Sequence, residues 1–374
     1  MSTTPDPDVV PAPSETIRLR SVLEELPAYV AGKPAAEDGS RRFKASSNES
    51  PFPPVAAVRD AAAAGLEVTN RYPDAAAHEL REALGTKHGV DPSQIALSTG
   101  SVAVTGDLVR ALVDQGDEVV YPWRSFEAYP ILVGSHGGVS VQVPLTAELE
   151  YDLDAMAAAV TDRTRLIILC TPNNPTGASL STAQIEAFLG AVPEDAVVAI
   201  DEAYREFHDP ATVAGTAGIF RRHGNVVLLR TFSKLQGLAG LRIGYAVAHP
   251  RLARALSQVT VPFGASIPAQ TAALMSLRGD VQQELDRRAV WIREERSRVL
   301  SALAEQGWQM PSAQGNFVYF PLGEKTTEFA EFADRRGLVL RAYGTDGVRA
   351  TIAEQEANDL LIEVARAWRE RRPA

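Results

Sequence analysis

The chain has 374 residues, of which 45% are hydrophobic and 22% are charged, and its formal net charge is -10. This composition is typical of a globular protein that is large enough for two domains, and the acidic balance argues against a nucleic-acid partner. No apolar run approaches the roughly 20 residues that a membrane-spanning helix needs, so a membrane is not expected as a partner either.

The N-terminal segment, MSTTPDPDVVPAPSET, is rich in Pro, Ser, Thr and Asp and lacks the basic start and apolar core of a signal peptide. We expect residues 1–40 to form a tail and arm, with a short helix that ends at Pro27. The single cysteine, Cys170, allows no disulfide within the chain, which favours a reducing, cytoplasmic location. The six histidines show no metal-ligand spacing, so no metal site is expected.

From residue 54 onward, helices and strands alternate. The sequence predicts helices at 54–65, 78–89, 101–116, 125–137, 152–161 and 181–192, the last with a capping box of Ser181 and Gln184. It predicts strands at 94–99, 117–122, 140–145, 165–170, 196–201, 225–231 and 241–248. Several strands are apolar throughout, as strands covered on both faces are. The alternation predicts an α/β fold with a mostly parallel sheet flanked by helices.

The pattern changes near residue 262. Helices are predicted at 267–277, 280–306, 327–337 and 354–372, and strands at 316–322, 338–343 and 347–353. This arrangement is typical of a smaller α+β domain. We therefore expect a large domain over residues 41–262, whose first part packs on the small domain, and a small domain over residues 263–374.

Residues that follow the strands are candidates for a site, because ligands of an open α/β sheet bind beyond the carboxyl ends of its strands. After the strand at 94–99, Gly100, Ser101 and Val102 open a helix whose N–H groups and dipole suit a phosphate. After the strand at 165–170, two asparagines and two prolines form a turn. Alone, each feature is also typical of an ordinary helix start or turn.

Charged side chains follow the next two strands. Asp201 ends an apolar run, where a buried carboxylate is costly unless it meets a cation, and Tyr204 follows shortly after. Lys234 lies between two hydroxyl residues and Arg242 in a stretch that is otherwise apolar and glycine-rich. A solvated lysine would need no such surroundings. A phosphate cradle, an amide, an acid with a phenol, and a lysine are together the parts of a pyridoxal phosphate site.

Three motifs carry a resemblance to a known family. NNPTG (173–177), AIDEAY (199–204) and TFSKLQGLAGLRIGY (231–245) together resemble fold-type I pyridoxal-phosphate aminotransferases, and most closely the histidinol-phosphate aminotransferase branch. Shorter segments agree, namely LPAYVAGK, SSNESPF, RYPD, WRSFEAYP, QGNFVYFPL and GVRATI. The resemblance runs from about residue 17 to the end and implies a homodimer with pyridoxal 5'-phosphate as cofactor.

The resemblance also implies roles for single residues. Lys234 is implied to bind the cofactor as a Schiff base and to move the substrate proton, and Asp201 to hold the pyridine nitrogen. The other implied cofactor contacts are Tyr204 and Asn174 at the 3-oxygen, Phe126 on the ring, and Thr231, Ser233, Arg242, Gly100, Ser101 and Val102 at the phosphate. Tyr72 is implied to reach the phosphate of the neighbouring subunit's cofactor. The implied substrate contacts are Arg349 and Asn174 at the α-carboxylate, Arg341 and Tyr29 at the side-chain end, and Asn48 in the segment that covers the site.

The expected reaction is transamination of an aromatic L-amino acid with 2-oxoglutarate. WRSFEAYP and the Gly-Ser-Val turn resemble actinobacterial aromatic amino-acid (phenylalanine) aminotransferases, and histidinol phosphate is the alternative substrate. Two departures from the family pattern, Leu235-Gln236 after the lysine and Ala353 after Arg349, leave the substrate open. A decarboxylase of a phosphorylated amino acid is a further alternative. A cofactor-binding regulator is disfavoured, because the first 40 residues are too few and too rich in proline for a DNA-binding domain.

Overall fold

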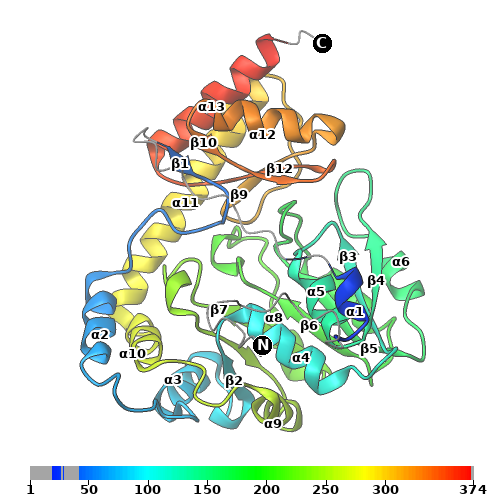
Figure 1. The fold of residues 1–374 in the computed structure, drawn as a ribbon, viewed down its shortest axis with the longest axis vertical. Helices are drawn as coiled ribbons and strands as arrows, with labels where there is room; N and C mark the ends of the chain where they lie inside the picture. Colours follow the sequence, from blue (N-terminus) through cyan, green and yellow to red (C-terminus); the bar gives the residue numbers. More distant parts are fainter. Residues whose placement is uncertain (1–18, 27, 29–41, 372–374) are drawn as a thin grey trace, which may run out of the picture.

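In the computed structural model, residues 19–26, 28 and 42–371 are described. A seven-stranded sheet of order β2-β8-β7-β6-β5-β3-β4 lies at the centre of the larger part (Figure 1). Its strands are β2 (Ile95–Ser98), β3 (Glu118–Trp123), β4 (Val139–Pro144), β5 (Thr164–Cys170), β6 (Val197–Asp201), β7 (Val226–Thr231) and β8 (Gly244–Val247). Strand β8 is antiparallel to β2 and β7, and the other neighbours are parallel. The predicted mostly parallel sheet is confirmed.

Helices cover both faces of this sheet, which explains the continuously apolar strands. In β5, Leu166 and Ile168 pack with α4 (Ser101–Leu112), α5 (Ala128–Ser135) and α9 (Pro250–Val259). The alternate residues Ile167 and Leu169 belong to the core on the other face. That core includes side chains of α3 (His78–His88), α6 (Leu153–Ala158), α7 (Thr182–Leu189), α8 (Thr216–Arg222) and α10 (Ile267–Ser276). Helix α7 begins with the predicted capping box.

The C-terminal part contains two small sheets. Strands β9 (Phe317–Phe320), β12 (Gly347–Thr351) and β11 (Arg341–Tyr343) form an antiparallel sheet, and β1 (Phe43–Lys44) pairs in parallel with β10 (Leu338–Val339). Helices α12 (Thr326–Asp334) and α13 (Gln355–Glu370) pack beside them (Figure 1). The long α11 (Gly279–Glu305) runs from α10 to these sheets, and α2 (Ala56–Leu66) packs on α10.

Some elements differ from the sequence predictions. The run 338–343, predicted as one strand, forms β10 and β11, which pair with different partners on either side of Leu340. Helices α8 and α9 were not predicted, although Pro250 at the first turn of α9 is a typical helix start. The N-terminal helix α1 covers only Val22–Glu25. The domain limits at about residues 40 and 262 stay a prediction.

Within the described part of the chain, no helix is both long and apolar enough to cross a membrane.

Candidate active site

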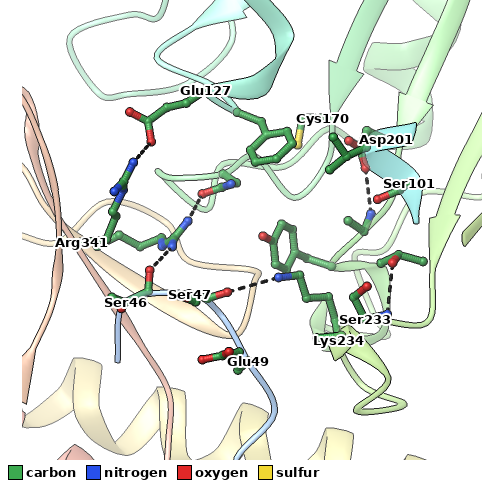
Figure 2. Close-up of a pocket in the computed structure, with 18 of the residues that line it drawn as sticks. Ser46, Ser47, Glu49, Ser101, Glu127, Cys170, Asp201, Ser233, Lys234 and Arg341 are labelled. Carbon is green, nitrogen blue, oxygen red and sulfur yellow. Dashed lines mark hydrogen bonds and ion pairs between the residues drawn. The ribbon is translucent and has the colours of Figure 1, made fainter. Parts of the chain in front are cut away.

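A cavity of about 280 Å³ lies beyond the carboxyl ends of β5, β6 and β7. The N-terminus of α4 lies on one side, and β11, β12 and the segment 46–49 close the other (Figure 2). The structure brings twelve of the predicted site residues to its wall: Ser101, Val102, Phe126, Asn174, Asp201, Tyr204, Thr231, Ser233, Lys234, Arg242, Arg341 and Arg349. The grouping arises because parallel strands direct their carboxyl ends to one edge of a sheet.

Lys234 follows β7 and extends its amine into the cavity (Figure 2). Its Nζ lies 3.4 Å from the carbonyl oxygen of Ser47, 3.3 Å from that of Asn48 and 5.3 Å from the centre of the Tyr204 ring. Burial of the amine, with the positive charge of Arg349, lowers the pKa of Lys234 to about 7. An amine with this pKa is partly unprotonated at neutral pH and can act as a nucleophile or a base.

Asp201 ends β6 and is buried, with 5% of its surface exposed. The Tyr129 hydroxyl donates a 2.7 Å hydrogen bond to Oδ2, and the backbone N–H of Ala203 donates a 3.1 Å bond to Oδ1. Burial raises the pKa of Asp201, and the Tyr129 bond opposes that rise. Within the described ranges, no cationic side chain lies within ion-pair distance of this carboxylate. A buried acid of this kind suits a ligand that brings a protonated nitrogen.

The end of the cavity near α4 is built for an anion. Gly100 is the N-cap of α4 with φ 99°, and no side chain caps the helix, so its first N–H groups face the cavity. Gly244 in β8 packs closely against the start of α4. A β-carbon at this position would lie only 2.5 Å from the backbone nitrogen of Ser101, so a larger residue would clash with it. Arg242 donates to Ser233 Oγ at 3.4 Å. With the hydroxyl of Thr231, these donors fit the phosphate of the cofactor that the sequence predicts.

Arg349 lies at the opposite end, in β12, and is 5% exposed. Its guanidinium donates to Asn174 Oδ1 and, at 2.6 Å, to the carbonyl oxygen of Ser46. Its Nε has no hydrogen-bond partner in the described structure. A buried guanidinium held only by neutral oxygens, with one N–H unused, suits a small carboxylate.

Other predicted residues lie behind or away from the cavity. Gly100 does not line the cavity, and a β-carbon at this position would clash with the Arg242 guanidinium. Asn48 is fully buried and donates a 3.1 Å hydrogen bond to the Tyr204 hydroxyl. Tyr72 is 80% exposed, and its ring lies 4.8 Å from that of Phe263 at another surface. Tyr29 lies outside the described residues.

The sequence interpretation missed four charged or aromatic residues of the site. Glu49, Glu127 and Tyr343 line the cavity, and Tyr129 bonds Asp201 behind it. Glu127 and Tyr129 stand in the same short motif as Phe126, but nothing in that motif indicates their partners. Glu127 pairs with Arg341, 214 positions later in the chain. Only the folded chain reveals such contacts.

The chain is similar to known proteins over most of its length. Residues 43–363 match the family "aminotransferase class I and II". The chain is 50% identical to an aromatic amino acid aminotransferase of Streptomyces avermitilis over 353 residues, covering 94% of this chain and 98% of that protein. It is 48% identical to an aromatic amino acid aminotransferase of Rhodococcus erythropolis over 352 residues, covering 94% and 96%. A histidinol-phosphate aminotransferase from Sinorhizobium meliloti, solved with pyridoxal-5'-phosphate, superposes with a TM-score of 0.85 at 29% identity, covering 95% of this chain and all of that one.

Proposed function

The chain belongs to the class I and II aminotransferase family, and on this premise we propose that it transfers the amino group of an aromatic L-amino acid to 2-oxoglutarate. The products are then the aromatic oxo acid and L-glutamate. The observation that carries this substrate class is the near full-length similarity, at about half of all positions, to proteins that act on aromatic amino acids. The cofactor is pyridoxal 5'-phosphate, which when bound supplies an aldehyde for the substrate amine and an electron sink for the α-carbon.

The chain's own residues account for cofactor binding, proton transfer and substrate orientation. Nζ of Lys234 would hold the cofactor through its aldehyde, and the same amine, when free, would serve as the general base for the substrate's α-proton. Its pKa of about 7 suits both tasks at neutral pH. The Asp201 carboxylate would hold the ring nitrogen, and the N-terminus of α4 with Arg242 would hold the phosphate. Arg349 orients the substrate by its α-carboxylate, beside Asn174.

We also propose that the protein acts as a homodimer. Tyr72 and Phe263 are exposed and in ring contact, and exposed Val68 and Val261 lie near them in the chain. A patch of this kind is typical of a protein interface. Since Tyr72 does not line the cavity of its own chain, its predicted phosphate contact requires the neighbouring subunit's site.

Steady-state kinetics test the proposed substrate class. The holoenzyme is assayed with phenylalanine, tyrosine and histidinol phosphate, each against 2-oxoglutarate, and the oxo-acid product is quantified. We expect kcat/KM for phenylalanine or tyrosine to exceed that for histidinol phosphate. The reverse order would replace aromatic amino acids with histidinol phosphate as the substrate. The Lys234→Ala variant serves as the background for each assay.

A further inference from the structure

Two arginines face the cavity from neighbouring strands of the small antiparallel sheet. Arg341 in β11 is the direct cross-strand partner of Arg349 in β12, and both line the cavity. Like charges placed opposite each other on one face of a sheet repel. The cavity therefore receives two guanidinium groups at the end where the substrate's carboxylate and side chain are expected.

The two arginines differ in their counter-charges. Arg341 Nη2 lies 2.5 Å from Oε2 of Glu127, with the two side chains only 11% and 28% exposed (Figure 2). Arg349 has only neutral oxygen partners, and no carboxylate lies within ion-pair distance of it in the described part of the chain. The Arg349 end therefore keeps a net positive charge, while the Arg341 end is close to neutral.

The surroundings of Arg341 are aromatic and charge-balanced. The Tyr343 ring is about equally close to both arginines, with its centre 5.5 Å from Cζ of Arg341 and 5.6 Å from Cζ of Arg349. Another nearby arginine, Arg124, is paired with Asp346, whose Oδ2 lies 2.7 Å from Arg124 Nε. These contacts leave an aromatic wall beside paired charges, which suits a flat, uncharged side chain.

We propose that Glu127 determines which anion the two arginines accept: by pairing with Arg341 it leaves only the Arg349 guanidinium open, which matches the α-carboxylate of an aromatic amino acid but not a phosphate monoester such as histidinol phosphate, whose ester group takes the place of that carboxylate. The inference rests on the proposed function and deepens it. An unpaired arginine is a strong phosphate ligand, but a carboxylate held on it repels a dianion. The distal carboxylate of 2-oxoglutarate can replace the Glu127 carboxylate on Arg341, because each carries one negative charge. A phosphate brings a second negative charge, which the single guanidinium does not balance.

The Glu127→Gln variant of the holoenzyme tests the proposal, since it keeps the side-chain shape and removes the charge. We expect the ratio of kcat/KM for histidinol phosphate to that for phenylalanine to rise by about tenfold or more, the effect of roughly one hydrogen-bonded charge. Isothermal titration with phenyl phosphate, a dianion that carries no amine, gives a readout without turnover. The Kd for phenyl phosphate should fall by a similar factor.

Glu49→Gln is the matched control, because Glu49 also lines the cavity but pairs with Lys44, at 2.9 Å. If Glu49→Gln shifts the kcat/KM ratio and the Kd for phenyl phosphate as much as Glu127→Gln does, the effect comes from the total charge of the cavity and not from the Glu127–Arg341 pair, and the proposal is overturned. An unchanged ratio in Glu127→Gln also overturns it. Should Glu127→Gln misfold, Glu127→Ser replaces it, because Glu127 is the N-cap of α5 and serine is a favoured N-cap residue. A wild-type enzyme inactive on aromatic amino acids would refute the proposed function, whereas the phenyl phosphate titration still decides the role of Glu127.

Discussion

The Tyr129 hydroxyl donates a 2.7 Å hydrogen bond to the Oδ2 atom of Asp201, and both side chains are buried. Tyr129 lies at the start of α5, where its ring also meets Phe126 edge-on at 5.5 Å. One side chain thus contacts both the acid expected at the cofactor nitrogen and the aromatic ring expected on the cofactor face. Without this bond, burial would raise the pKa of Asp201 further.

We predict that Tyr129→Phe weakens cofactor binding by about tenfold, since a hydrogen bond to a charged group contributes about 1.5–3 kcal/mol. The carboxylate would more readily protonate, and it would then hold the ring nitrogen less well. Spectrophotometric titration of the apoprotein measures the Kd. Tyr121→Phe is the control, because Tyr121 is equally buried and touches the Tyr129 ring, but its hydroxyl accepts from Gln142. Equal losses in both variants would show that only packing is involved.

The pKa of Lys234 predicts a pH dependence of cofactor capture. Well below pH 7 the amine is protonated and cannot attack the aldehyde, so the capture rate of the apoprotein should rise with pH, with a midpoint at about pH 7, and level off about one pH unit higher. Stopped-flow mixing of the apoprotein with the cofactor measures this profile. Because the charge of Arg349 lowers the pKa of Lys234, Arg349→Gln should move the midpoint to higher pH. Arg124→Gln should not, since Arg124 is paired with Asp346. A midpoint near the ordinary lysine value in the wild type would contradict the prediction.

Mixed dimers test whether Tyr72 crosses between subunits. Tyr72→Ala chains keep Lys234, and Lys234→Ala chains keep Tyr72, so a heterodimer would hold one complete site only if the two residues come from different chains. We expect each homodimer to be impaired and the mixture to regain activity, up to about a quarter of the wild-type activity for random pairing. The assay uses low cofactor concentrations, at which loss of a phosphate contact matters most. No recovery in heterodimers verified by native mass spectrometry would place Tyr72 outside the neighbouring site.

A buried charge cluster behind Asp201 predicts a stability effect. Glu202 is 1% exposed, and its carboxylate accepts from Arg230 Nε at 2.8 Å, Arg205 Nη1 at 2.8 Å and Thr216 Oγ1 at 2.7 Å. Glu202→Ala would leave the Arg230 guanidinium buried without this partner, and should lower the free energy of unfolding by about 3–5 kcal/mol. Urea denaturation of the apoprotein measures the change. Glu194→Ala, at an exposed position, should cost less than about 0.5 kcal/mol. A Glu202→Ala loss equally small would show that the cluster adds no net stability.

The site residues at the ends of the strands could be predicted from the sequence for a physical reason. Strands covered on both faces are apolar throughout, so the polar residues at their ends, such as Asp201 and Lys234, stand out in the sequence. The parallel topology then brings those ends together. Contacts between residues distant in sequence could not be predicted in this way. Glu127–Arg341 and Tyr129–Asp201 span 214 and 72 positions, and each depends on how the small sheets and α5 pack against the large sheet.

The pairing of β1 with β10 has a mechanical consequence. Ala45 is bonded on both sides, to Val339 and Thr351, and the backbone N–H of Asn48 donates to Thr351 Oγ1 at 2.9 Å. The segment 45–48 is therefore fastened to the same small sheets that carry Arg341 and Arg349, although it belongs to the start of the chain. Any hinge rotation of those sheets would move Arg349 and the carbonyl oxygens beside Lys234 as one rigid body. Binding of the substrate carboxylate and shielding of the Lys234 amine would therefore change together.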